Sequence, residues 1–142
     1  MAPSRLIVLF ICTHNSSRSQ MAEGFLRHLY GNRYAAHSAG TQPGQVNPYA
    51  VQVMAEVGVD LSKHRSKSID GFLNSEIDYV ITVCDSAKET CPIFPGGKQI
   101  QHKSFEDPSA ATGTQEQILT SFRVVRDQIR TWIETKFRNK DL

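Results

Sequence analysis

The apolar positions of the chain fall into short continuous runs and into longer stretches with helical spacing. The run at 6–11 has no polar alternation, which is typical of a central parallel strand covered on both faces. Further strand patterns occupy 77–83 and, more weakly, 34–38 and 99–102. Because these strands alternate with helical segments, we expect an open parallel α/β sheet, whose ligands bind beyond the carboxyl ends of the strands.

Two of the helical segments have recognisable ends. The first begins near Gln20 and stops near Gly31. The second has Asn47 as its N-cap and Pro48 at its first helical position, and it ends at Gly58. The inward face of the first helix is predicted to carry Met21, Ala22, Phe25, Leu26 and Leu29.

The last helix has the clearest pattern in the chain. Thr114 and Gln117 can form a capping box at its start. Its apolar residues recur at spacings of three and four, at Ile118, Phe122, Val125, Ile129, Trp132 and Ile133. This stripe predicts a helix packed against the core. The stretch 59–72 is predicted to be irregular.

The polar stretch between the first strand and the first helix carries the candidate chemistry. We call it the anion loop, and it consists of Cys12, Thr13, His14, Asn15, Ser16, Ser17, Arg18 and Ser19. Backbone N–H groups at such a loop and at a helix N-terminus favour a bound anion. A helix N-terminus and a cation favour the thiolate form of a nearby cysteine, and a guanidinium holds an oxyanion through two parallel hydrogen bonds. We therefore predict that Cys12 is a nucleophile and Arg18 an anion ligand.

Composition and charge limit the partners and the cellular location that we expect. A net charge of +2 over 142 residues is too small to indicate a nucleic-acid partner. No apolar run is long enough to span a bilayer, and the first residues lack the layout of a secretory signal. Three cysteines, an odd number, argue against a fixed disulfide scaffold. We expect a soluble, cytoplasmic monomer with one domain over 1–142 and no membrane partner.

The Cys-x5-Arg-Ser pattern from Cys12 to Ser19 resembles the phosphate loop of the low-molecular-weight protein tyrosine phosphatases. The Ser-Gln-Met-Ala-Glu-Gly segment that ends at Gly24 is similar to the thioredoxin-coupled arsenate reductases built on the same fold. The resemblance covers nearly the whole chain. It implies a four-stranded parallel sheet in the order 2-1-3-4, with helices on both faces.

The resemblance also implies a thiol relay through Cys12, Cys84 and Cys91. Cys12 attacks arsenate, Cys84 attacks the Cys12 sulfur and releases arsenite, and Cys91 then attacks Cys84. The resulting Cys84–Cys91 disulfide is reduced by thioredoxin or another thiol donor. The alternative is that Cys84 is an ordinary buried strand residue and Cys91 an incidental surface thiol.

Distances bear on the two disulfides of this relay. Adjacent strands lie ~4.8 Å apart, so thiols at the ends of the first and third strands can pair. If Cys84 to Cys91 were helical, seven positions would separate their Cα atoms by about 10 Å, which is too far for a disulfide. That segment must therefore unwind during turnover.

Loss of an oxygen from the tetrahedral centre requires a proton donor. Asp107 resembles the Asp-Pro motif that supplies the general acid in both families, and Glu106 is its nearest rival. The phosphatases follow this proline with an aromatic residue that grips a phosphotyrosyl ring, whereas this chain has Ser109. The stretch 44–47 offers no aromatic wall either. A small inorganic oxyanion suits these residues better than an aryl phosphate.

The resemblance assigns supporting roles within the anion loop. The Ser19 hydroxyl is expected to contact the Cys12 thiolate, and the Asn15 side chain to pin the loop. His14 stands where these families usually have glycine, so its backbone is either not left-handed or strained; we expect it to be structural. Backbone N–H groups come chiefly from Thr13, Ser16 and Ser17.

Some relatives bind potassium through Asn, Glu, Ser and Asp. Asn15, Glu23 and Ser38 match this set, but Lys67 replaces the acid, and its ammonium can stand in for the ion. We therefore expect no metal and no other cofactor. The remaining histidines have no metal-ligand spacing, namely His28, His37, His64 and His102.

The leading hypothesis is an arsenate reductase of arsenic detoxification, with arsenate as substrate and thioredoxin as electron donor. The alternative is a low-molecular-weight phosphatase that acts on aryl or protein phosphotyrosine. A third possibility is a non-catalytic module that binds an oxyanion or senses redox state.

Overall fold

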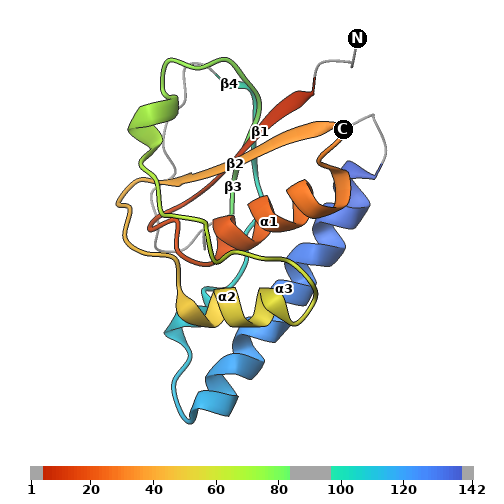
Figure 1. Cartoon of the computed structure of the whole chain (residues 1–142). Coiled ribbons are helices and arrows are strands. Elements are labelled where there is room, and N and C mark those ends of the chain that lie inside the picture. The colour runs from red at the N-terminus through yellow and green to blue at the C-terminus, as the bar shows by residue number, and fades with distance from the viewer. Residues whose placement is uncertain (1–4, 84–96, 139–142) are drawn as a thin grey trace.

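The computed structural model describes residues 5–83 and 97–138, and a parallel sheet forms its centre (Figure 1). Its strands are β1 (Leu6–Cys12), β2 (Tyr34–Gly40), β3 (Ile77–Thr82) and β4 (Gly97–His102). They lie in the order β2-β1-β3-β4, and every pair is parallel. The predicted sheet order is therefore confirmed. β2 and β4 are each two residues longer than their patterns predict.

β1 is the central strand and pairs on both sides. Cys12 lies opposite Gly40 of β2, and Ile11 lies opposite Thr82 of β3. Val8 and Phe10 point into the larger hydrophobic core, while Leu9 and Ile11 point into a smaller one on the opposite face. Burial on both faces explains the uninterrupted apolar run.

Helical segments cover both faces of the sheet. The helices α1 (Arg18–Tyr30), α2 (Pro48–Ala55) and α3 (Gln115–Phe137) share the larger core (Figure 1). On the opposite face, Ile69, Phe72 and Leu73 pack against the smaller core. The first two belong to a short 3-10 helix, η1 (Ile69–Phe72), in the stretch predicted to be irregular. Ser68 caps this turn by accepting a hydrogen bond from the backbone N–H of Asp70.

The predicted N-caps are present, but the second helix is shorter than predicted. The Asn47 side chain accepts a hydrogen bond from Tyr49 N at 2.8 Å and caps α2, which ends at Ala55 and not at Gly58; Gly58 closes the turn that follows, with φ +82°. Thr114 and Gln117 form the capping box of α3. None of the helices within 5–83 and 97–138 is long and apolar enough to cross a membrane.

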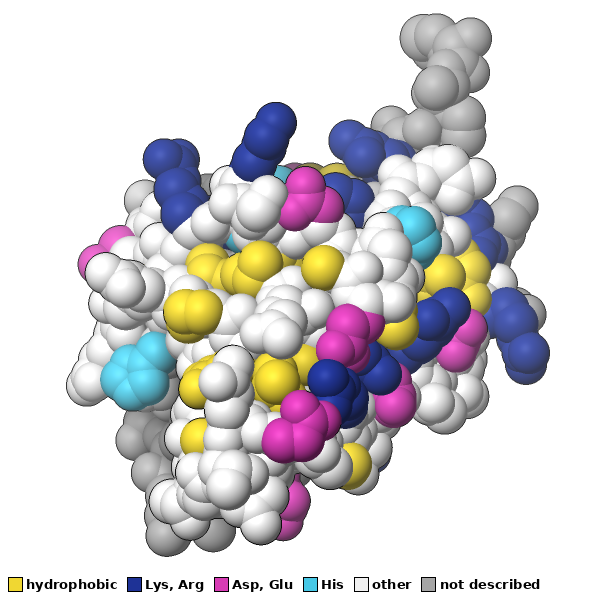
Figure 2. Space-filling model, turned by 60° about the horizontal axis from the view of Figure 1, so that its bottom comes forward, with side chains coloured by type: hydrophobic (Ala, Val, Ile, Leu, Met, Phe, Trp, Pro, Cys, Tyr) yellow, Lys and Arg dark blue, Asp and Glu magenta, His cyan; other side chains and the backbone are white. Residues whose placement is uncertain are grey.

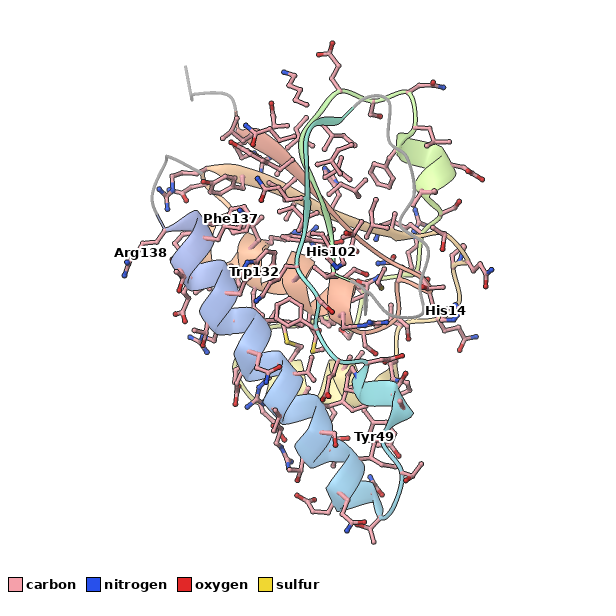
Figure 3. The ribbon with its side chains drawn as sticks, turned by 180° about the vertical axis from the view of Figure 1, so that it is seen from behind. His14, Tyr49, His102, Trp132, Phe137 and Arg138 are labelled. Atoms are coloured by element: carbon pink, nitrogen blue, oxygen red, sulfur yellow. The ribbon has the colours of Figure 1, made fainter. Side chains whose placement is uncertain are left out.

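Aromatic rings anchor α3 to the sheet. Trp132 and Phe137 extend from α3 toward the strands (Figure 3), and both make edge contacts with Phe10 at centroid distances of 6.0 and 6.2 Å. Phe137 also meets Tyr34 of β2 at 5.1 Å. The pattern of spacings did not include Phe137, although its side chain is fully buried. Trp132 touches Phe105 as well, which fixes the chain between β4 and α3.

Charged side chains of both signs gather over α2 and α3 on the face that Figure 2 presents. Arg123 and Arg126 of α3 both bind the Glu56 carboxylate at 2.8 Å, and Arg126 also donates to the Val53 carbonyl. The hydrogen bond from Arg123 is the main reason why the pKa of Glu56 lies below its ordinary value of 4.5. The two helices are thus joined by charge outside their apolar contact.

We predict that Glu56→Gln lowers the free energy of unfolding at pH 7 by about 1 kcal/mol, the upper range for an exposed pair. A carboxyl whose pKa is lower in the folded than in the unfolded state stabilises the fold above its unfolded-state pKa. This contribution is lost as the pH falls through the folded-state pKa. The difference between variant and parent should therefore shrink as the pH falls below 4.5.

Urea unfolding over a pH series measures this difference. Glu76→Gln, at an exposed position before β3, is the matched control and should show no such trend. A Glu56→Gln difference that stays constant down to acidic pH would mean that charge is not the source of its effect.

Candidate active site

The anion loop lies where β1 ends and α1 begins. Cys12 is the last residue of β1, and Ser17 is the N-cap of α1. Both neighbouring strands, β2 and β3, end beside it (Figure 1). The sequence thus places the loop at the carboxyl edge of the sheet, where parallel α/β folds bind ligands.

The carbonyl groups of the anion loop bind segments outside it. These bonds run from Gln42 N to Thr13 O at 2.8 Å, from Gly44 N to His14 O at 3.1 Å and from Asn47 N to Ser16 O at 3.0 Å. In a trans peptide the N–H points opposite to the carbonyl. The N–H groups that follow these three carbonyls, those of His14, Asn15 and Ser17, therefore point away from these segments and are available to an anion.

Asn15 holds the loop in shape from within. It is the non-glycine residue with a positive φ, +50°, among the described residues, so the left-handed turn falls here and not at His14. Its Oδ1 accepts from Lys67 N at 2.9 Å and from Gln20 Nε2 at 3.0 Å. Its Nδ2 donates to Ser19 Oγ at 2.8 Å. The predicted pinning contacts of Asn15 are present.

The Ser19 hydroxyl lies 2.8 Å from the Cys12 sulfur. Because Ser19 Oγ already accepts a hydrogen bond from Asn15, its own proton is free to be donated to the sulfur. The predicted Ser19–Cys12 contact is therefore present.

Arg18 and Asp107 face each other across the site. The Arg18 side chain is 5% exposed, and its guanidinium donates to the Phe105 carbonyl at 3.3 Å and lies 3.7 Å from Asp107 Oδ2. The Asp107 side chain is 38% exposed, and its Oδ1 accepts from the Ser109 backbone N–H at 3.0 Å and from the Ser109 hydroxyl at 2.6 Å. Ser109 thus orients Asp107 at the mouth of the site, with Oδ2 toward Arg18.

These groups surround one cavity of about 230 Å³. It is lined by Cys12, His14, Ser16, Ser17, Arg18, Gly44, Gln45, Asn47, Asp107 and Ser109. No aromatic side chain lines it, and it is smaller than the roughly 300–1,000 Å³ of typical pockets for organic ligands. Glu106 lines a separate hollow beside α3, so Asp107 is the acid that shares the cavity with Cys12. The cavity suits a small tetrahedral ion.

Asn15 and Ser19 do not line the cavity but are fully buried behind it, together with Gln20. Gln20 donates to the Asn15 carbonyl and to the Arg65 carbonyl, and it accepts from His64 Nδ1 at 2.9 Å. Burial lowers the pKa of His64. Its Nε2 faces Arg27 Nη1 at 3.1 Å, and because a guanidinium can only donate, the proton of the ring lies on Nδ1, toward Gln20. Neither Gln20 nor His64 stands out in the sequence, because a polar helix position and a loop histidine are usually exposed.

His14 lines the cavity and lies away from Trp132 and Phe137 (Figure 3). Its Nδ1 is 2.9 Å from the Gln42 carbonyl, which can only accept, so Nδ1 carries the proton. This bond ties the loop to the segment after β2.

The Glu23 carboxylate lies behind the loop and is buried. Ser38 Oγ donates to its Oε1 at 2.6 Å, and the Lys67 ammonium lies 3.6 Å from the same oxygen. Arg27 binds the other oxygen at 2.7 Å. Lys67 thus places a covalently attached cation next to Glu23 and Ser38. Groups of three or more His, Cys, Asp or Glu side chains that could hold a metal are absent from the described part of the chain.

Cys84 and Cys91 lie outside the described residues. The last residue before Cys84 is Val83, whose N–H donates to the Ile11 carbonyl at 2.8 Å. The chain therefore enters this segment beside Cys12, and the contacts of Cys84 and Cys91 stay predictions.

Most of the chain is similar to proteins of one known family. The family model described as low molecular weight phosphotyrosine protein phosphatase matches residues 7–139. The arsenate reductase of Halalkalibacterium halodurans is 42% identical over 132 residues, which cover 93% of this chain and 95% of that protein.

Solved structures give the same relationship. An arsenate reductase in its phosphate-binding state has a TM-score of 0.78 and 34% identity, and the match covers 92% of this chain and 95% of that one. A thioredoxin-dependent arsenate reductase of Corynebacterium glutamicum has a TM-score of 0.60 and 26% identity, with 95% of this chain and 65% of that one covered.

We predict that Gly40→Ala distorts the anion loop. A Cβ at Gly40 would lie 2.6 Å from the Thr13 carbonyl oxygen and 2.9 Å from Asn15 N, and backbone atoms cannot move aside as a flexible side chain does. Overpacking of this kind costs about 1–3 kcal/mol of stability, which urea unfolding measures.

Gly44→Ala is the control for this substitution, because a Cβ at Gly44 meets nothing within 4 Å. It should leave stability within about 0.5 kcal/mol of the parent, as surface substitutions usually do. Equal effects of the two substitutions would show that the contact between Gly40 and the loop does not constrain the fold.

Proposed function

Because the chain belongs to the low molecular weight phosphotyrosine protein phosphatase family, and within it to the arsenate reductases, we propose that it reduces arsenate to arsenite with electrons from thioredoxin. The observation that carries this proposal is the cavity of about 230 Å³ that Cys12, Arg18 and Asp107 share. A nucleophile, an anion ligand and an acid meet there in a space suited to an inorganic oxyanion. Its place in metabolism is then arsenic detoxification.

The anion loop carries out the first step. Backbone N–H groups of the loop and the Arg18 guanidinium hold the arsenate oxygens, as charge-assisted donors do best. The Cys12 thiolate attacks arsenic and forms a sulfur–arsenic bond. The hydroxyl group of the hydrogen arsenate dianion takes a proton, in our proposal from Asp107, and leaves as water as its bond to arsenic breaks. Arsenic is still in its pentavalent state at this point.

The second step moves two electrons to arsenic. Cys84 attacks the Cys12 sulfur, a disulfide forms, and the sulfur–arsenic bond breaks with its electron pair on arsenic, which leaves as arsenite. Cys91 then attacks Cys84 and frees the Cys12 thiolate. Thioredoxin, or another thiol donor, reduces the Cys84–Cys91 disulfide. The bond from Val83 N to the Ile11 carbonyl supports this order, because it brings the chain alongside Cys12 immediately before Cys84.

The position of Lys67 is relevant to whether the enzyme needs a metal ion. Its ammonium lies 3.6 Å from Glu23, which accepts a hydrogen bond from Ser38. We propose that this charge takes the part that potassium plays in some relatives, so that the enzyme needs no metal. The cytoplasmic location and monomeric state likewise stay predictions.

One pair of assays tests the proposed function against its alternatives. NADPH oxidation is followed with arsenate, thioredoxin and thioredoxin reductase, beside hydrolysis of p-nitrophenyl phosphate. Arsenate turnover with feeble hydrolysis supports the reductase. Fast hydrolysis without arsenate turnover would identify a phosphatase instead. If neither activity is observed, the remaining hypothesis is a non-catalytic module that binds an oxyanion or senses redox state.

We predict that Asp107→Asn lowers kcat for arsenate roughly 100-fold, the lower range for loss of a general acid. The amide keeps the shape of the side chain but cannot supply the proton. Steady-state kinetics of the coupled assay give the value. Glu106→Gln removes the neighbouring carboxylate, which lies outside the cavity, and should keep kcat within about twofold of the parent, since surface changes are usually small. Equal losses of kcat in both variants would show that Asp107 is not the general acid.

We also predict distinct failures for the two outer thiols. Cys84→Ser should not sustain turnover, because no thiol then attacks the Cys12 sulfur. Cys91→Ser should release one arsenite per protein and stop with a Cys12–Cys84 disulfide. Mass spectrometry of peptides after one exposure to arsenate identifies these species. Continued turnover by Cys84→Ser would contradict the relay.

A further inference from the structure

We propose that the side-chain hydroxyl of Ser17 is a direct ligand of the bound oxyanion, in addition to the backbone N–H groups of the anion loop. This proposal depends on the proposed function in one respect, namely that an oxyanion binds in the cavity. It concerns the specificity and affinity of that site, not the thiol chemistry.

The first observation is a hydroxyl without a partner. Ser17 is 4% exposed, and its Oγ is the one buried side-chain oxygen or nitrogen within the described residues that has no hydrogen-bond partner. The neighbouring buried polar side chains of the loop, Asn15, Ser19 and Gln20, all have partners. Folded proteins rarely leave a buried hydroxyl unsatisfied, because the loss of its bonds to water is not offset.

The second observation is that Ser17 does not cap its own helix. Ser17 occupies the N-cap of α1, where a serine normally accepts a hydrogen bond from the helix backbone. It does not do so, and its backbone angles, φ −127° and ψ −72°, lie outside the extended region typical of a cap. The caps of α2 and α3, Asn47 and Thr114, both make the usual bond. The hydroxyl of Ser17 is thus available for something other than its own helix.

The third observation is what Ser17 faces. It lines the same cavity as Cys12 and Arg18, at the start of the 13-residue helix α1. The partial positive charge of that helix end favours an anion. A hydroxyl there can rotate to donate to an oxyanion oxygen, and the bond to a charged acceptor is stronger than one between neutral groups. An oxyanion bound in the cavity therefore supplies the partner that the Ser17 hydroxyl lacks within the described residues.

Inorganic phosphate serves as the probe, because it has the shape and charge of the substrate and is not reduced. A hydrogen bond to a charged group contributes about 1.5–3 kcal/mol, so Ser17→Ala should weaken phosphate binding roughly tenfold to a hundredfold. Isothermal titration calorimetry measures the dissociation constant. Ser17→Thr, which keeps the hydroxyl, should bind more tightly than Ser17→Ala. Ser75→Ala, at an exposed position before β3, should bind like the parent.

The melting temperature without phosphate separates a ligand from a structural residue. Ser17→Ala removes an unsatisfied hydroxyl, so its melting temperature should equal or exceed that of the parent, while the increase on adding phosphate should shrink. Unchanged phosphate affinity in Ser17→Ala would overturn the proposal. So would a lower melting temperature without phosphate, since the hydroxyl would then be holding the fold.

The proposed function is judged separately from Ser17. A parent protein that binds phosphate but does not reduce arsenate would refute the reductase, whereas the loss of affinity in Ser17→Ala would still support the ligand. In an active enzyme, Ser17→Ala should raise KM for arsenate by more than it lowers kcat. A parent protein that does not bind phosphate at all would overturn the role of Ser17.

Discussion

The shape of the anion loop depends on Asn15. A left-handed turn at a residue with a side chain is unfavourable on its own, and here it is held by three hydrogen bonds of that side chain, to Ser19, Gln20 and Lys67. The same bonds fix the hydroxyl that faces the Cys12 sulfur. Nucleophile, loop conformation and the segment around Lys67 are therefore one connected structure, and a change in any of them reaches the others.

Behind this structure lies a balance of buried charge. Glu23 is removed from water, which is costly unless the carboxylate is paired and hydrogen-bonded. Ser38, Lys67 and Arg27 supply those partners from β2, from the segment after α2 and from α1 itself. Polar contacts to Glu23 therefore join these three parts of the chain behind the anion loop. They lie beside the apolar core that positions α1 and α3.

The features that could be predicted from the sequence are those that depend on a local pattern of residues. The strand run of β1, the caps at Asn47 and Thr114 and the spacing from Cys12 to Arg18 each have a physical cause within a few neighbouring residues. Gln20 could not be found this way, because it is buried only once Arg65, far along the chain, packs against it. Phe137 stands four positions after Ile133 and continues the stripe of α3, so its burial follows the same local pattern, whereas its contacts with Phe10 and Tyr34 of two different strands depend on the fold. The missing partner of Ser17 is likewise a property of the folded loop alone.

The ammonium of Lys67 has a consequence beyond the geometry of Glu23. A dissociable ion occupies its site only as far as its concentration in the medium allows, whereas a charge attached to the chain has an effective concentration set by the tether. The counter-charge of Glu23 is therefore always present, whatever salts surround the protein.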